Sequence, residues 1–77
     1  MDISVLFFGA LTDVTGTSRK HYSGIESYDD LKYRIEDDFP ELVHYNFRVA
    51  VNNEIINEDL LLRNGDEVSY IPPFAGG

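Results

Sequence analysis

The residues with the clearest potential for chemistry stand at the end of the sequence, where Gly76 and Gly77 follow shortly after Pro72 and Pro73. Proline fixes φ, and a proline pair favours an extended chain, so the four residues after Pro73 could reach roughly 13 Å from a folded domain. Glycine has no Cβ, so the last two residues fit a passage only as wide as a backbone. We therefore expect residues 74–77 to form a flexible tail that delivers the carboxylate of Gly77 into the active site of another protein.

The alternative interpretation of this tail is an ordinary frayed terminus, which is common in small domains. A terminal pair of glycines arises by chance in about one chain in two hundred at the usual glycine frequency. Its coincidence with a proline pair favours a function over fraying. In that function the inserted residues are Phe74, Ala75, Gly76 and Gly77.

No other set of residues has the composition or spacing of a catalytic or metal site. The two histidines, His21 and His44, fall in different predicted elements, and cysteine is absent. A chain without cysteine has no thiolate nucleophile, no cysteine zinc site and no disulfide. The acidic residues Asp29, Asp30 and 36–38 crowd one predicted helix, where a solvated face is a simpler interpretation than a metal site. We expect no metal, no permanently bound cofactor and no active site within this chain alone.

Length and charge narrow the classes of partner. A chain of 77 residues has room for one domain, and its hydrophobic content of 43% is typical of a folded one. The formal net charge of −8 makes nucleic acid and anionic membranes poor partners, so we expect a protein partner with a basic rim. The sequence has no targeting signal and no apolar run long enough to cross a membrane, which predicts a cytoplasmic protein.

Residues 1–73 predict a single α+β domain. The apolar run over residues 3–8 is typical of a central strand covered on both faces. Further elements follow in the order short helix, charged edge strand, main helix and two or three strands, at residues 10–15, 18–22, 27–39, 47–51, 54–56 and 67–71. Residues 60–62 are apolar without a clear period, and we expect them to form a single turn that fills the core.

The main helix has the clearest boundaries. Ser27 is a good N-cap residue, and acidic residues in the first turn favour the positive end of the helix dipole. Leu31, Ile35 and Phe39 recur every four residues and predict a stripe that packs on a sheet. Pro40 forces the preceding residue out of helical geometry and ends the helix.

The order of the elements predicts the topology. A right-handed crossover would place the first and last long strands side by side and parallel, with the remaining strands antiparallel and the helix across one face. This is the β-grasp, or ubiquitin-like, architecture, with a mixed sheet of four to five strands.

Three segments of the sequence resemble one known family. These are GDEVSYIPPFAGG at residues 65–77, VLFFGAL at residues 5–11 and AVNNE at residues 50–54. Together they are similar to the MoaD/ThiS sulfur-carrier proteins, and most similar to the branch that supplies the small subunit of molybdopterin synthase. The resemblance extends over the whole chain.

The resemblance implies a chemical cycle at Gly77. An E1-like adenylyltransferase (MoeB-like) would use ATP to form a transient acyl-adenylate on the Gly77 carboxylate, and a sulfur donor protein would replace AMP to leave a thiocarboxylate. The tail would then enter the large subunit of molybdopterin synthase (MoaE-like), in a heterotetramer, and give sulfur to a pterin precursor (precursor Z) to form molybdopterin. The catalytic Lys and Arg residues would belong to the large subunit.

The resemblance also implies a partner interface, which we expect to comprise Phe7, Phe8, Ile71, Pro72, Pro73 and Phe74. The alternative interpretation of Phe7 and Phe8 is that they belong to the core. The chain departs from the family at two positions near it. Ile71 stands where an aromatic residue is frequent, and Thr12 stands where several relatives have an arginine. Alternative functions with the same tail are a sulfur carrier for thiazole or tRNA thiolation, a ubiquitin-like modifier joined to lysines, and a binding module with an inert tail.

Overall fold

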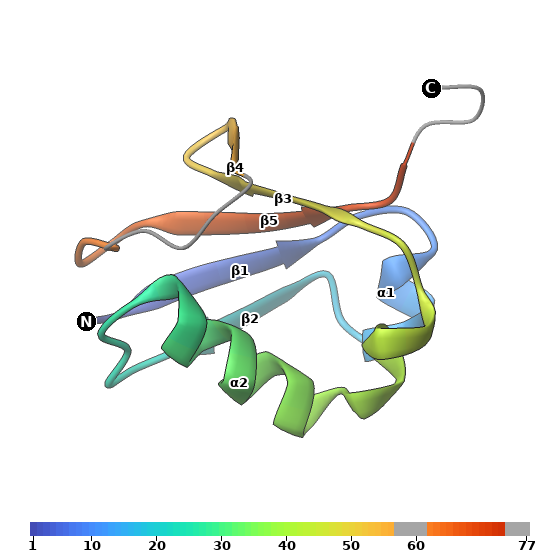
Figure 1. Ribbon diagram of the computed structural model, residues 1–77, viewed down its shortest axis with the longest axis horizontal. Helices are drawn as coiled ribbons and strands as arrows, with labels where there is room; N and C mark the ends of the chain where they lie inside the picture. Colours follow the sequence, from blue (N-terminus) through green and yellow to red (C-terminus); the bar gives the residue numbers. More distant parts are fainter. Residues whose placement is uncertain (57–61, 74–77) are drawn as a thin grey trace.

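The fold is seen in a computed structural model, which describes residues 1–56 and 62–73. A mixed sheet lies over one long helix (Figure 1). In chain order the elements are β1 (Ile3–Phe7), α1 (Leu11–Thr15), β2 (Arg19–Tyr22), α2 (Tyr28–Asp38), the 3-10 helix η1 (Pro40–His44), β3 (Arg48–Val51), β4 (Glu54–Ile56) and β5 (Glu67–Ile71). No helix among the described residues is long and apolar enough to span a membrane.

The sheet has five strands in the order β2-β1-β5-β3-β4. The two central strands, β1 and β5, run parallel, with Val5 opposite Val68 and Phe7 opposite Tyr70. The pairs β1 with β2, β3 with β4 and β3 with β5 are antiparallel. The predicted β-grasp topology is confirmed. Because β1 and β5 end at the same edge of the sheet, the residues that follow each strand lie close together.

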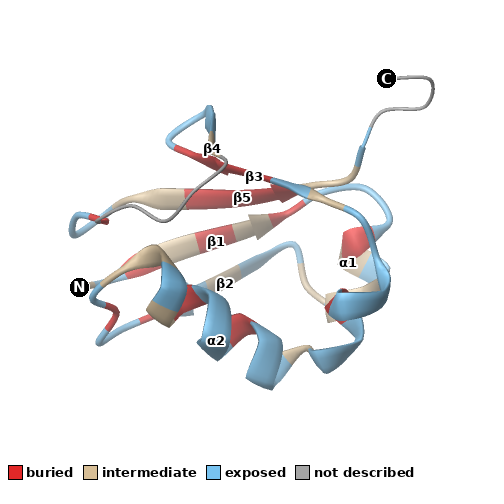
Figure 2. Cartoon of the chain, in the orientation of Figure 1, coloured by how far each residue is buried: buried red, intermediate tan, exposed pale blue. Residues whose placement is uncertain are grey.

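Side chains alternate between two faces of the sheet. We call the face that packs against α2 the inner face, and the opposite one the outer face. Figure 2 shows buried positions on the central strands and on α2. The core cluster consists of Ile3, Val5, Phe7, Leu11, Tyr22, Ile25, Leu31, Ile35, Leu42, Val49, Val51, Leu62, Val68 and Tyr70.

Helix α2 begins and ends where the sequence predicts. The Ser27 side chain accepts a hydrogen bond from the backbone N–H of Asp30 at 3.2 Å, and the Asp30 carboxylate accepts one from the N–H of Glu26 at 3.1 Å. The first bond satisfies a backbone donor that the helix itself leaves free, and the second ties the residue before the N-cap to the first turn. Phe39 ends the helix with φ −132° and ψ 71°, as expected before Pro40.

Two leucines outside the sheet and helix α2 also belong to the core. The 3-10 helix η1 was not predicted, and it places Leu42 in the core with 1% of its surface exposed. Leu62 is buried as expected, with 4% exposed. Leu60 and Leu61 lie outside the described residues, so the single turn predicted over residues 60–62 remains a prediction.

Candidate functional site

The exit of the tail lies at the end of β5. Ile71 is the last residue of the strand, Pro72 is partly exposed and Pro73 is exposed. The predicted tail, residues 74–77, lies outside the described residues, so its flexibility and its insertion into a partner remain predictions. The backbone N–H of Phe8 donates to the carbonyl of Tyr70 at 3.1 Å and so extends the pairing of β1 with β5 up to the exit. The starting point of the tail is therefore fixed to the centre of the sheet.

The turn after β1 contacts the exit directly. Gly9 has φ +56°, and a Cβ atom at this position would lie 2.9 Å from Cγ of Pro72, closer than real Cβ atoms approach. The carbonyl of Gly9 accepts hydrogen bonds from both the N–H and the hydroxyl of Thr12, at 3.1 and 2.8 Å. The turn is thus held by α1 and leaves room for the ring of Pro72. The only sequence signal of this contact is a glycine directly after an apolar strand.

The predicted interface residues divide between the two faces of the sheet. Phe7 has only 2% of its surface exposed, and its ring packs 5.6 Å from the rings of Phe39 and Tyr70. The Phe7 side chain therefore belongs to the core, which is the alternative interpretation of this residue, and a role of Phe7 in the interface remains a prediction. Phe8, the next residue, is 45% exposed on the outer face. Phe8 and Ile71 are brought together there, because β1 and β5 run in register.

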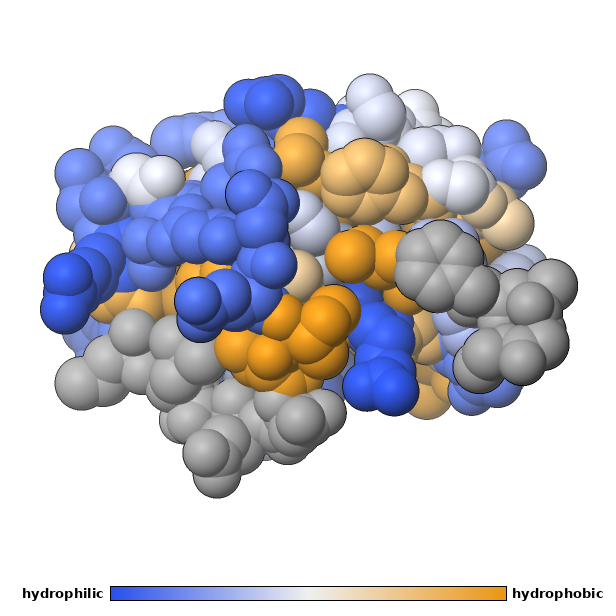
Figure 3. Space-filling view, turned by 90° about the horizontal axis from the view of Figure 1, so that it is seen from above, coloured by the Kyte–Doolittle hydropathy of each residue, from blue (hydrophilic) through white to orange (hydrophobic). Residues whose placement is uncertain are grey.

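The outer face has an apolar centre. Figure 3 views the sheet from the side opposite α2 and shows hydrophobic side chains in its middle, with hydrophilic ones along the left and upper margins. Strand pairing sets Leu6 opposite Ser69, Ser69 opposite Ala50, and Ala50 opposite Ile55. Ala50 and Ser69 are small and only 2% and 5% exposed, so they form the floor of this area between larger apolar neighbours. The apolar area adjoins the exit of the tail at Ile71.

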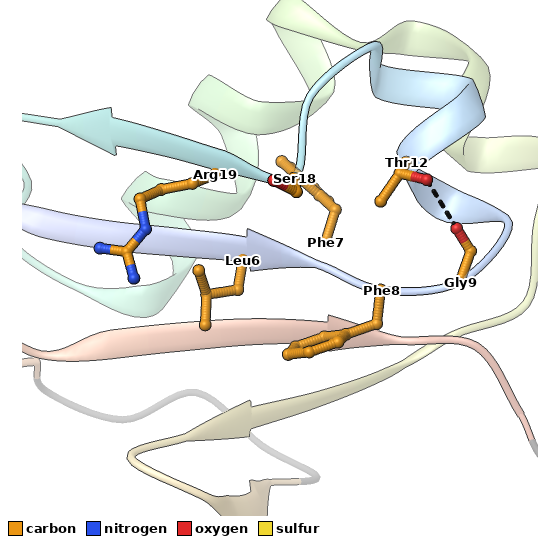
Figure 4. Close-up of a pocket in the computed structure, with 7 residues that line it drawn as sticks. All are labelled: Leu6, Phe7, Phe8, Gly9, Thr12, Ser18 and Arg19. Atoms are coloured by element: carbon orange, nitrogen blue, oxygen red, sulfur yellow. Dashed lines mark hydrogen bonds between the residues drawn. The ribbon is translucent and has the colours of Figure 1, made fainter.

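A shallow open pocket of about 440 Å³ lies at the end of β1. Its lining includes Leu6 and Phe8 of the outer face, Gly9 next to the tail exit, and Arg19 of β2 (Figure 4). Figure 4 shows the pocket between the end of β1, the start of β2 and α1. The pocket extends the apolar area of the outer face towards the edge strand.

The titrating groups with shifted pKa values belong to the fold and not to the outer face. Burial raises the pKa of Tyr70 and of Tyr28 above the usual range of tyrosine. Burial, and then the hydrogen bond to Asp38, do the same for Tyr22. His21 lies 3.7 Å from a carboxylate oxygen of Asp2 on the surface. No three His, Asp or Glu side chains within residues 1–56 and 62–73 are grouped so that they could hold a metal ion.

Comparison with known proteins places the chain in a family. The family model described as "ThiS family" matches residues 5–77. The chain belongs to this family. The molybdopterin synthase sulfur carrier subunit of Mycobacterium tuberculosis is 31% identical over 80 residues, which cover 97% of this chain and 96% of that protein. The resemblance inferred from the sequence motifs is confirmed.

Solved structures confirm the fold. One is a complex of subunits 1 and 2 of the molybdopterin-converting factor from Helicobacter pylori, which this chain matches with a TM-score of 0.79 at 22% identity, covering 100% of both chains. Another is the small archaeal modifier protein 1 of Methanosarcina acetivorans, with a TM-score of 0.84 at 24% identity, covering 99% of this chain and 96% of that one. At such identities the likeness establishes the β-grasp architecture alone.

Proposed function

We propose that this chain is a sulfur carrier and acts as the small subunit of molybdopterin synthase. The observation that carries the proposal is its 31% identity, over almost its full length, with a relative that bears this function in its name. The family match extends to Gly77, so the glycine pair falls within the matched region. The complex of two subunits known from Helicobacter pylori supports a large synthase subunit as the stable partner.

The chemistry proposed for Gly77 has three steps. An E1-like adenylyltransferase joins the Gly77 carboxylate to the α-phosphate of ATP, and pyrophosphate leaves. Sulfur delivered by a donor protein at the oxidation level of hydrosulfide attacks the activated carbonyl carbon, and AMP leaves with the bonding electrons, so that a thiocarboxylate remains. In the large subunit the thiocarboxylate sulfur attacks a carbon of the pterin precursor and displaces an oxygen group from that carbon. Water then attacks the Gly77 carbonyl carbon and breaks its bond to sulfur, so that the sulfur stays on the pterin and the carboxylate of Gly77 is restored. ATP is thus bound by the activating enzyme and not by this chain.

The folded domain supports this chemistry because it fixes the point where the tail begins. The exit at Pro72 and Pro73 is fixed to the sheet through β5 and through the contact with Gly9. We propose that Phe8, Ile71, Pro72, Pro73 and Phe74 line the interface with the large subunit, in a heterotetramer with two copies of each chain. We place the reaction in the cytoplasm, where ATP and the activating enzyme meet the carrier.

The experiment is reconstitution with the large subunit, the activating enzyme, ATP, a sulfur donor and the pterin precursor. Molybdopterin should form with the wild-type chain and should not form with a chain that lacks residues 76–77 or carries one additional residue after Gly77. Undiminished product from either variant, with no trimming of the extended one, would contradict the proposal. Lysine conjugates that depend on Gly77, or thiazole formed in place of molybdopterin, would favour the alternative carriers and modifiers.

A further inference from the structure

Two arginines lie on the outer face, beside the apolar area. Arg19 of β2 is paired in register with Leu6, and Arg48 of β3 is paired with Ile71. Paired residues on neighbouring strands project to the same face. A chain with a net charge of −8 has only six Lys and Arg residues in total. The outer face therefore carries two of these six cationic side chains, beside the carboxylate of Glu67.

Neither arginine has a strong ion pair with the part of the chain that the structure describes. Arg19 lies 3.9 Å from the carboxylate of Glu67, and the two side chains are 64% and 39% exposed. Such an exposed pair contributes about 0–1 kcal/mol and exchanges readily for another carboxylate. Arg48 is exposed and makes no ion pair with any residue of segments 1–56 and 62–73.

Two other cations on the helix side have structural contacts. Lys20 lies 3.7 Å from the carboxylate of Asp38 and is placed over the rings of Tyr22 and Phe39. Arg34 donates to the carbonyl of Ser23 and lies over the ring of Tyr22. Their roles in the fold are evident from these contacts. Within the described residues, comparable contacts are not seen for Arg48 and are weak for Arg19.

We infer that the outer face docks a partner surface with an apolar centre and with carboxylates opposite Arg19 and Arg48. The inference rests on the proposed function, in which this partner is the large synthase subunit. Burying Phe8 and Ile71 under a partner removes water from the neighbouring arginines, and a desolvated guanidinium requires a carboxylate as its counterpart. Since Ile71 directly precedes the tail exit, a partner docked here also lies against the point where the tail begins.

Two electrostatic effects act on docking at this surface, one at long range and one at contact distance. The net charge of −8 acts at long range and favours approach to a basic region of the partner. The two arginines act at contact distance and select a surface that has acidic residues next to apolar ones. The basic rim expected from net charge alone therefore describes the approach, and not the contacts of the outer face.

Charge reversal with a matched control tests the inference. The variants Arg19→Glu and Arg48→Glu are compared with Lys32→Glu, which makes the same change in net charge at an exposed position of α2. Association and dissociation rates are measured with the isolated large subunit at low and physiological salt. Dissociation should accelerate about thirtyfold for each arginine variant and less than about twofold for the control. The milder variants Arg19→Gln and Arg48→Gln should also dissociate faster than the control variant. Circular dichroism confirms that each variant is folded.

The possible results of these binding measurements distinguish failure of the inference from failure of the proposed function. Equal effects of the three charge reversals would mean that only net charge matters and would overturn the inference. Tighter binding by the arginine variants would mean that the partner is basic at this face, and would overturn it as well. In both cases sulfur transfer by the wild-type chain would leave the proposed function intact. Failure of the wild-type chain to bind the large subunit would reject the proposed function, and the inference with it.

Discussion

The hydrogen bond between Tyr22 and Asp38 ties the edge strand that carries Arg19 to the end of α2, and its removal gives a measurable prediction. The tyrosine hydroxyl donates to Oδ2 of Asp38 at 2.6 Å, and Tyr22 has only 3% of its surface exposed. Lys20 lies 3.7 Å from the same oxygen. The substitution Tyr22→Phe keeps the ring, and with it the contacts of Lys20 and Arg34, and removes the hydrogen bond alone.

The expected loss follows from the type of bond. A hydrogen bond to a charged group contributes about 1.5–3 kcal/mol to the free energy of unfolding. We expect Tyr22→Phe to cost about 2 kcal/mol, which lowers the melting temperature of a domain of this size by roughly 8–16 °C. Thermal and urea unfolding at neutral pH measure the change. The control is Tyr33→Phe, which alters a tyrosine on α2 that is 72% exposed and should leave the midpoint unchanged.

The same substitution predicts a change in the pH dependence of stability. Burial and the bond to Asp38 raise the pKa of Tyr22 above its value of about 10 in the unfolded chain. The folded state then retains a proton that the unfolded state releases, so this stabilisation is complete below pH ~10 and is lost as the pH rises above it. Each such tyrosine contributes a slope of about 1.4 kcal/mol per pH unit in that range. Tyr22→Phe should therefore make the alkaline decline shallower, while Tyr70 and Tyr28 maintain part of it.

Two results would refute this reasoning. One is a Tyr22→Phe variant with the wild-type midpoint at neutral pH. That result would mean that the hydrogen bond from Tyr22 contributes no more to the free energy of unfolding than a water molecule bound to Asp38 would. The other is an unchanged alkaline slope, which would mean that Tyr22 titrates alike in the folded and unfolded chains.

Three further predictions concern the helix cap, the core and the outer face. Replacing Ser27 by alanine removes the N-cap bond and should cost about 0.5–2 kcal/mol in urea unfolding, whereas Ser23→Ala, at an exposed position, should cost almost nothing. Ile35 is fully buried, so Ile35→Ala should cost about 2–5 kcal/mol and Ile35→Val about 0.5–1.5 kcal/mol; equal losses would argue against close packing under the sheet. Phe7→Ala should destabilise the domain by about 3–5 kcal/mol, whereas Phe8→Ala should mainly weaken binding to the large subunit, as calorimetric titration would show. A larger loss of stability from Phe8→Ala than from Phe7→Ala would reverse our assignment of the two faces.

The elements that the sequence predicts well are those with local signals. The N-cap at Ser27, the stripe of Leu31 and Ile35 and the stop at Pro40 all lie in or next to α2, and each acts on its near neighbours in the chain. The left-handed turn at Asn52 and Asn53, with φ of 49° and 72°, likewise suits the local sequence, because asparagine tolerates this conformation. The parallel pairing of β1 and β5 follows from the order of the elements and the handedness of crossovers.

The features that the sequence did not predict depend on which strands, far apart in the sequence, become neighbours in the sheet. The run over residues 3–8 is apolar on both faces, so its pattern alone does not tell that Phe7 points to the helix and Phe8 to the outside. Arg19 of β2 and Arg48 of β3 come to one face only through β1 and β5, which lie between those two strands in the sheet. The contact of Gly9 with Pro72 likewise joins segments at opposite ends of the chain. Such neighbours are set by strand register, which no local pattern in this sequence encodes.

Mass spectrometry of the intact chain provides the most direct test of sulfur transport on Gly77. The protein is incubated with the adenylyltransferase, ATP and a sulfur donor, and fragments of the product then locate any modification. We predict a mass increase that corresponds to replacement of one oxygen atom by sulfur, confined to Gly77 and dependent on ATP. An unchanged mass under conditions in which the activating enzyme charges a known carrier would contradict the account.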